Sequence, residues 1–213
     1  MNTVAIVSRK GGTGKTSIAM NLASALAVRR RVAVMDLDPQ GSATRWAEWA
    51  EGGLPFEVHS FNTGRGVGQF KSALEGLREG VDLLILDTPP EVETPTKLAL
   101  LVADLALIPT APSALDLWAT QEAIGAAREA REARGSSLPL VATVPSRMNY
   151  RTREAKELPD TLKALGEPVA PPIGLRVEVQ RAVIQGRVVT PGSEAGREFF
   201  YLARYVINRL RRV

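Results

Sequence analysis

Residues 9–17 read Arg-Lys-Gly-Gly-Thr-Gly-Lys-Thr-Ser, and this stretch decides the fold of the 213-residue chain. An apolar run at residues 4–7 precedes it and apolar residues at helical spacing follow it, which is the strand, loop and helix order of a phosphate-binding loop. The glycines let backbone N–H groups turn toward phosphate oxygens, and the helix that begins near Lys15 directs its positive dipole end at them. The stretch therefore predicts a site for a nucleoside triphosphate.

The polar side chains of this loop have separate expected roles. We expect Lys15 to reach the β- and γ-phosphates and the Thr16 hydroxyl to ligate Mg²⁺. A Gly-rich turn with chance lysines is the alternative, but seven consecutive positions and both flanks fit the phosphate loop. The predicted nucleotide contacts in the loop are Lys10, Gly11, Gly12, Thr13, Gly14, Lys15, Thr16 and Ser17.

A second candidate segment is Asp-Leu-Asp-Pro-Gln at residues 36–40, which follows an apolar strand expected at residues 32–35. That strand delivers two carboxylates to the carboxyl edge of the sheet, where ligands of open α/β folds bind. Such carboxylates can hold the water shell of Mg²⁺ or orient the attacking water, and we assign Asp36 to the metal and Asp38 to catalysis. The alternative is structural, with Asp36 ending a strand and Asp38 capping a helix.

A third segment, residues 82–90, reads Asp-Leu-Leu-Ile-Leu-Asp-Thr-Pro-Pro. An apolar strand that ends in an aspartate is typical of the Walker B carboxylate, so Asp87 is predicted to serve the same Mg²⁺. The two prolines cannot continue the strand, and residues 88–90 are expected to form a switch near the γ-phosphate.

Strands alternate with helical patterns at about eight places, which predicts an α/β fold with a doubly wound, mostly parallel twisted sheet flanked by helices. Residues 1–213 are expected to form one domain, with no N-terminal DNA-binding domain, because no linker or repeat is evident. The chain has no cysteine, which excludes disulfides, a cysteine-ligated iron–sulfur cluster and a thiol nucleophile. No apolar run approaches the roughly 18 residues of a membrane span, and a cytoplasmic location is the natural expectation.

The positive charge of the chain is concentrated at its C-terminal end. Residues 1–175 have a net charge of −1, whereas residues 176–213 hold 8 arginines against 3 glutamates. A basic surface of this kind suggests a polyanionic partner such as nucleic acid or anionic lipid, and a solvated arginine-rich face is the alternative. The candidates for phosphate contacts are Arg176, Arg181, Arg187 and Arg204.

Two tryptophans and the single histidine are given structural roles. Trp46 and Trp49 lie at i and i+3 of an amphipathic helix expected at residues 42–50, so we expect both to pack in the core. His59 has no nearby partners that would form a metal or nucleophile site.

The motifs resemble, in order, those of small ParA-type partition ATPases of the ParA/MinD superfamily of P-loop NTPases. The resemblance rests on the deviant Walker A pattern at residues 10–16, with its extra lysine Lys10, and on the segments at 36–40 and 87–90. Weaker support comes from Pro-Ser-Ala-Leu-Asp at 112–116 and Gln-Arg at 180–181. In MinD-like relatives an Asn-Arg pair lies near the adenine base, and because Ser146 replaces the Asn here, Arg147 is the remaining candidate for a base contact.

The resemblance implies a cycle that uses ATP and Mg²⁺. ATP would join two copies in a sandwich dimer, in which Lys10 of each subunit contacts the phosphates held by the other and acts with Lys15 in catalysis. The dimer would bind DNA without sequence preference, in the cytoplasm on the nucleoid, and a ParB-like partner would stimulate hydrolysis and release it. The cargo would be a plasmid or a chromosome locus.

Two other functions fit the same motifs. The same cycle could position a protein cargo, such as a carboxysome or a chemoreceptor cluster, because the partner protein reads the cargo. A MinD-like regulator would instead cycle on a membrane through a terminal basic amphipathic helix, for which residues 199–213 superficially qualify. We favour a core helix there, and consider membrane binding the weaker prediction, because the helix continues the predicted fold and no flexible tether precedes it. A metabolic ATPase is disfavoured because no substrate-binding constellation is found.

Overall fold

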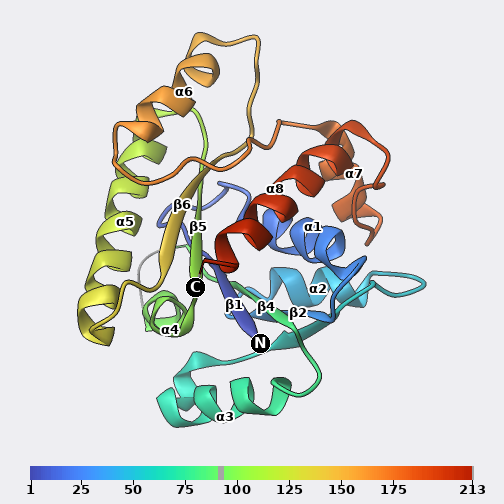
Figure 1. The fold of residues 1–213 in the computed structure, drawn as a ribbon. Helices are drawn as coiled ribbons and strands as arrows, with labels where there is room; N and C mark the ends of the chain where they lie inside the picture. The colour runs from blue at the N-terminus through green and yellow to red at the C-terminus, as the bar shows by residue number, and fades with distance from the viewer. Residues whose placement is uncertain (91–93, 213) are drawn as a thin grey trace.

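The computed structural model describes residues 1–90 and 94–212. Its centre is a six-stranded sheet in the order β3-β2-β4-β1-β5-β6, in which all neighbouring strands are parallel (Figure 1). The predicted doubly wound parallel sheet is thus confirmed, with six strands in the described part of the chain. The strands are β1 (Asn2–Ile6), β2 (Val32–Asp36), β3 (Glu57–Ser60), β4 (Leu83–Asp87), β5 (Leu105–Thr110) and β6 (Leu140–Pro145).

Helices cover both faces of this sheet because alternate side chains of each buried strand enter two different cores. Val4 and Ile6 of β1 point into the core formed with α1, α2, α7 and α8, whereas Ala5 points into the core formed with α3, α4 and α5. A smaller hydrophobic cluster packs α6 against the segment that follows β6. The helices are α1 (Lys15–Ala27), α2 (Ser42–Glu48), α3 (Val67–Leu77), α4 (Thr94–Val102), α5 (Ala114–Arg134), α6 (Arg153–Lys163), α7 (Val177–Ile184) and α8 (Glu194–Leu210).

The C-terminal helix α8 is part of the core, as predicted. Its apolar stripe of Phe199, Leu202, Val206 and Leu210 is buried, and the helix lies alongside α1 (Figure 1). The last residue of the predicted 199–213 helix lies outside the described residues. Among the described residues, no helix has the length and apolarity needed to cross a membrane.

The prediction that both tryptophans pack in the core is wrong for one of them. Trp46 is 3% exposed and its indole Nε1–H donates to the Arg187 carbonyl at 3.0 Å, but Trp49 is 60% exposed. Trp49 is the C-cap residue of α2 and keeps a helical backbone conformation, so it lies at the end of the helix, where its side chain is exposed. The backbone of Trp49 is instead approached by Gly186, where an added Cβ would lie 2.1 Å from the Trp49 carbonyl oxygen.

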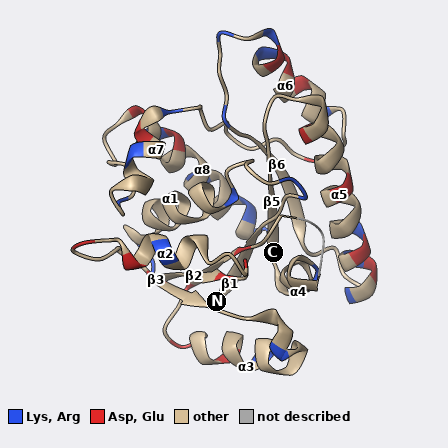
Figure 2. Cartoon of the chain, turned by 180° about the vertical axis from the view of Figure 1, so that it is seen from behind, with Lys and Arg blue, Asp and Glu red and all other residues tan. Residues whose placement is uncertain are grey.

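Charged side chains are distributed unevenly over the helices. Figure 2 shows Lys/Arg and Asp/Glu interspersed along α5 and α6, as expected for solvated helix faces.

His59 lies on β3, where its Nε2 is 3.0 Å from the exposed Glu57 carboxylate. The described residues contain no group of three or more His, Cys, Asp or Glu side chains placed to hold a metal, and the structural role of His59 stays a prediction.

Candidate functional site

The loop between β1 and α1 has the backbone shape of a phosphate cradle. It leaves the carboxyl end of β1, the edge where ligands of parallel sheets bind. Gly14 is the N-cap of α1 and adopts φ 94°, a left-handed conformation that residues with a Cβ rarely adopt. Gly12 also has positive φ, at 77°. The N–H groups of the first turn of α1 are therefore available to an anion at this point.

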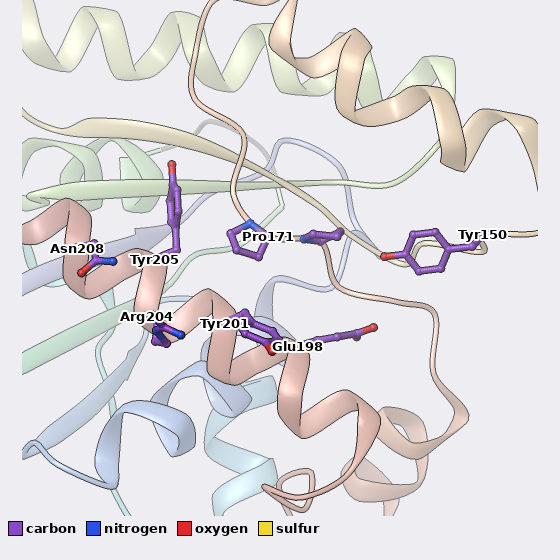
Figure 3. Close-up of a pocket in the computed structure, with 8 residues that line it drawn as sticks. Tyr150, Pro171, Glu198, Tyr201, Arg204, Tyr205 and Asn208 are labelled. Carbon is purple, nitrogen blue, oxygen red and sulfur yellow. The ribbon is translucent and has the colours of Figure 1, made fainter.

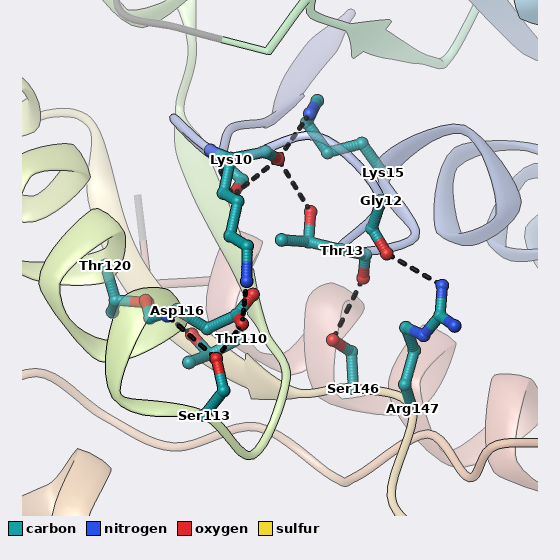
Figure 4. A network of polar contacts seen from close by, with 11 residues as sticks. Lys10, Gly12, Thr13, Lys15, Thr110, Ser113, Asp116, Thr120, Ser146 and Arg147 are labelled. Carbon is teal, nitrogen blue, oxygen red and sulfur yellow. Dashed lines mark hydrogen bonds and ion pairs between the residues drawn. The ribbon is translucent and has the colours of Figure 1, made fainter.

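Lys15 is buried beneath the loop. Its side chain belongs to the first residue of α1, is nearly enclosed, and donates from Nζ to the Lys10 carbonyl at 3.2 Å (Figure 4). Burial lowers the pKa of Lys15 below its usual value, and the carboxylates of Asp87 and Asp38 partly oppose that shift. An ammonium that, among the described residues, has only a carbonyl oxygen as acceptor is well placed to bind a phosphate group.

Lys10 leaves the same loop in another direction (Figure 4). Its Nζ lies 2.6 Å from Oδ2 of Asp116, whose side chain is only 5% exposed, at the start of α5. The Ser113 hydroxyl caps α5 and also contacts this carboxylate. The ion pair of Lys10 with Asp116 was not predicted, although the available signal was an acidic residue in the first turn of a helix that follows a strand at the same sheet edge.

Two carboxylates end neighbouring strands at the same level. Asp36 of β2 and Asp87 of β4 are paired in register, and both are buried. Asp36 is fully engaged, because its oxygens accept from the Asp38 N–H at 3.1 Å and from the N–H and hydroxyl of Thr44 at 2.9 and 3.0 Å. Asp38 is half-buried, and its Oδ1 accepts from the Gln40 N–H at 2.9 Å.

Asp87 is different because neither of its oxygens has a hydrogen-bond partner of full geometry among the described residues. Burial raises the pKa of Asp87 to about 7, and the nearby Thr16 hydroxyl and Lys15 ammonium oppose the effect while Asp36 adds to it. An unpartnered buried carboxylate beside a hydroxyl is the kind of hard oxygen site that suits Mg²⁺. The residues predicted for the metal, Thr16, Asp36 and Asp87, therefore lie together. Thr16 and Asp87 are suited to direct contact with the ion, whereas the hydrogen-bonded Asp36 is suited to contact through water.

A second part of the site lies on the other side of the loop. A small cavity of about 90 Å³ is bordered by the loop, by the residues after β6, and by α7. Ser146 donates from its hydroxyl to the Thr13 carbonyl at 3.0 Å, and Arg147 donates to the Gly12 carbonyl at 2.8 Å (Figure 4). Arg147 thus lies against the phosphate loop, and its contact with the base stays a prediction.

Of the four arginines predicted to bind phosphates of a polyanion, three lie on or beside α7 and one lies on α8. Arg176 precedes α7 and Arg181 lies on it, Arg187 lies in the loop that follows, and Arg204 lies on α8. The Arg176 guanidinium lies 2.7 Å from carboxylates of both Glu194 and Glu198, so its charge is largely balanced. The other three are exposed.

Arg9 occupies the position where the Walker A pattern has its first glycine, and its side chain points away from the loop. Its guanidinium lies 2.8 Å from the Glu122 carboxylate on α5, and both side chains are about half exposed. An exposed ion pair of this kind contributes little to stability, typically less than about 1 kcal/mol.

Comparison with known proteins gives a consistent result. Residues 4–189 match the family model described as the CobQ/CobB/MinD/ParA nucleotide binding domain. The "Maintenance of carboxysome distribution protein A" of Halothiobacillus neapolitanus is 32% identical, over 98% of this chain and 95% of the relative. The protein of that name from Gloeobacter kilaueensis is 43% identical over 117 residues, and this chain spans only 51% of that relative. The chromosome-partitioning ATPase Soj of Thermus thermophilus is 30% identical, over 97% and 96% of the two chains.

Solved structures share the fold at lower sequence identity. A chain of the MinC:MinD cell division protein complex of Aquifex aeolicus has a TM-score of 0.81 and 16% identity, covering 98% of this chain and 96% of its own. A Cyanothece McdA variant in complex with ATP has a TM-score of 0.81 and 18% identity, covering 99% and 96%. These similarities extend over the whole sheet and its helices.

Proposed function

The chain belongs to the CobQ/CobB/MinD/ParA family of nucleotide-binding domains as a ParA-type ATPase, and we propose that its ATP cycle positions a large cargo by switching a dimer on and off DNA. The observation that carries this proposal is that the side chains of Lys10 and Lys15 leave the same loop in different directions. Lys15 stays under its own loop, whereas the Lys10 side chain extends away from it and is 38% exposed. Lys10 would leave its ion pair with Asp116 to serve the nucleotide of a second copy.

The geometry supports separate roles for the residues of the site during ATP hydrolysis. The loop N–H groups and Lys15 would bind the β- and γ-phosphates, and Thr16, Asp36 and Asp87 would hold Mg²⁺, directly or through water. Bound Mg²⁺ would supply positive charge to the phosphate oxygens. Asp38 would orient the water that attacks the γ-phosphorus, the bond to the β–γ bridging oxygen breaks, and ADP and inorganic phosphate result. Lys10 of the second copy would stabilise the charge that develops on the transferred group.

Two cargoes remain as candidates, because relatives with either name match almost the whole chain. The similarity to carboxysome distribution proteins supports a protein assembly as cargo, and the similarity to Soj supports a DNA locus. Deleting the gene in its host separates them. A carboxysome cargo predicts clustered carboxysomes with normal inheritance of DNA, whereas a DNA cargo predicts plasmid loss or cells without a chromosome.

The dimer can be tested directly with Lys10→Ala. We expect the wild-type protein to double its mass in light scattering with ATP and Mg²⁺ but not with ADP, and Lys10→Ala to remain monomeric. Lys71→Ala, which removes an exposed lysine on α3, should behave as the wild type. Because Lys10→Ala leaves the buried Asp116 carboxylate unpaired, Lys10→Ala/Asp116→Asn serves as a second, better balanced variant. Normal dimerisation of both variants would refute the role of Lys10.

A further inference from the structure

A basic groove lies between the end of α1 and the outer face of α8, away from the residues of the nucleotide site. Its volume is about 570 Å³, and it is lined from two parts of the chain that are far apart in sequence. Arg29 and Arg30 follow α1, and Arg204 and Arg211 come from α8. The four side chains meet there because α1 and α8 pack against each other.

The charge of this groove is not balanced from within the chain. All four arginines are exposed, no carboxylate is among the lining residues, and in the described part of the chain none of the four makes an ion pair. The positive charge of Arg30 helps to lower the pKa of Asp82, but the Asp82 carboxylate forms its ion pair with Arg31, at 2.8 Å. This situation contrasts with Arg176, whose two glutamates leave it little free charge.

The hollow on the other flank of α8 shows the difference. It has a volume of about 490 Å³, and Figure 3 shows Arg204, Tyr205 and Asn208 of α8 on one side and Tyr150 and Pro171 on the other. Glu198 also lines this second hollow, so a phosphate there would meet a carboxylate. Arg204 borders both hollows, but only the groove toward α1 combines it with three further arginines.

We propose that this groove, defined by Arg29, Arg30, Arg204 and Arg211, binds the phosphodiester backbone of duplex DNA. The inference rests on the proposed function and specifies where its DNA tether lies. Guanidinium groups bind phosphate oxygens with two parallel hydrogen bonds, and several of them in one groove follow a backbone without reading bases. The groove thus gives affinity without sequence preference.

The structure favours nucleic acid over a membrane surface as the polyanion. A helix that lies in a membrane interface must present its apolar face to the lipid. The apolar stripe of α8, including Phe199 and Val206, is instead buried against the rest of the core. At the groove the helix presents Arg204 and Arg211 together with the exposed Phe200, whose ring centre lies 5.9 Å from the Arg204 guanidinium.

The affinity for DNA is expected to depend on ATP because the ATP-bound dimer has two grooves and the monomer has one. One groove offers four phosphate contacts at most, whereas an ATP-bound dimer joins two grooves and makes the second contact intramolecular. Each phosphate contact adds about 0.9 to the slope of log affinity against log salt concentration. The dimer is therefore expected to bind duplex DNA more tightly, and with a steeper salt dependence, than the monomer.

The test measures fluorescence anisotropy of a labelled random-sequence duplex with the full chain, ATP and Mg²⁺, over a series of salt concentrations. We expect Arg204→Gln/Arg211→Gln and Arg29→Gln/Arg30→Gln each to weaken binding on the order of tenfold or more, and to lower the salt slope by about 2 to 4. Arg204→Lys/Arg211→Lys keeps the charge but loses the paired hydrogen bonds of the guanidinium groups, so it should keep the salt slope and lose less affinity than the glutamine variant.

The matched control is Arg65→Gln/Arg128→Gln, which removes the same charge from exposed positions on other elements and should bind DNA as the wild type does. Light scattering with ATP checks that each variant still dimerises. If the wild type binds DNA but the groove variants bind with the same affinity and slope, the groove is not the site, although the tether stands. If the wild type binds no duplex in any nucleotide state, the proposed function itself fails. Binding of the wild type to phosphatidylglycerol vesicles in place of DNA would assign the groove to a membrane and overturn the inference.

Discussion

Lys10 and Asp116 form an ion pair with one largely buried partner, and its removal has a measurable cost. The Asp116 side chain is 5% exposed and its carboxylate is 2.6 Å from the Lys10 ammonium, while Lys10 is 38% exposed. Removing Lys10 leaves a buried carboxylate without its counter-charge, whereas removing both charges does not. The pair therefore has to be judged by a double-mutant cycle.

We expect Lys10→Ala to lower the free energy of unfolding of the ligand-free protein by about 1 to 3 kcal/mol, less than a fully buried pair because Lys10 is partly solvated. In the Lys10→Ala/Asp116→Asn variant part of that loss should be recovered. Urea unfolding of the wild type, both single variants and the double variant gives the coupling energy. Strictly additive effects would mean that the ion pair contributes nothing.

Asp87 makes the stability of the ligand-free protein depend on pH. Its pKa is about 7 in the folded chain, against an ordinary value of 3.8, because of burial. Between about pH 4 and pH 7 the folded state therefore holds a proton that the unfolded state has released. The contribution of this group to stability falls as the pH rises through that window, by no more than about 1.4 kcal/mol per pH unit.

We expect Asp87→Asn to remove this dependence, so that its stability relative to the wild type increases from pH 5 to pH 7 and then levels off. The comparison is made by urea unfolding at several pH values without nucleotide or Mg²⁺. Titrating groups that do not interact with Asp87 cancel because they are common to both proteins. Parallel stability curves for the two proteins across this range would contradict the raised pKa.

At the scale of elements, α8 is held by its buried stripe. Phe199 is 1% exposed, whereas the next residue, Phe200, is 52% exposed. We expect Phe199→Ala to destabilise the protein by about 3 to 5 kcal/mol and Phe200→Ala by about 0.5 kcal/mol or less. Urea unfolding of the two variants, matched in chemistry and adjacent in sequence, measures the difference. Similar small losses in both would indicate that α8 is not a core helix.

The elements that could be predicted from sequence are those in which local pattern and tertiary packing agree. The strands that end in Asp36 and Asp87 are apolar on both faces, and the stripe of α8 repeats at helical spacing, so both were identified correctly. The prediction for Trp49 was wrong because helical spacing does not show where the covering of a helical face stops, and Trp49 is the exposed C-cap residue at the end of α2. The ion pair of Lys10 with Asp116 joins residues that are 106 positions apart, which no local pattern contains.

At the scale of the whole molecule, the fold brings together arginines that lie far apart in the sequence, so the basic surface is not formed by the C-terminal segment alone. The net charge of residues 176–213 is +5, but the groove also contains Arg29 and Arg30, which follow the first helix. Conversely, Arg176 belongs to the basic segment and is balanced by Glu194 and Glu198. Counting charges along the chain therefore predicted a polyanionic partner, but only the packing of α1 on α8 indicates a place for it.

The most direct test of the account is the binding of the wild-type protein to a random-sequence DNA duplex with ATP, with ADP and without nucleotide, over a salt series. An ATP-switched dimer with one basic groove in each subunit predicts tight binding with ATP alone and a steep loss of affinity as the salt concentration rises. Equal binding in all three nucleotide states, or no binding in any, would contradict it.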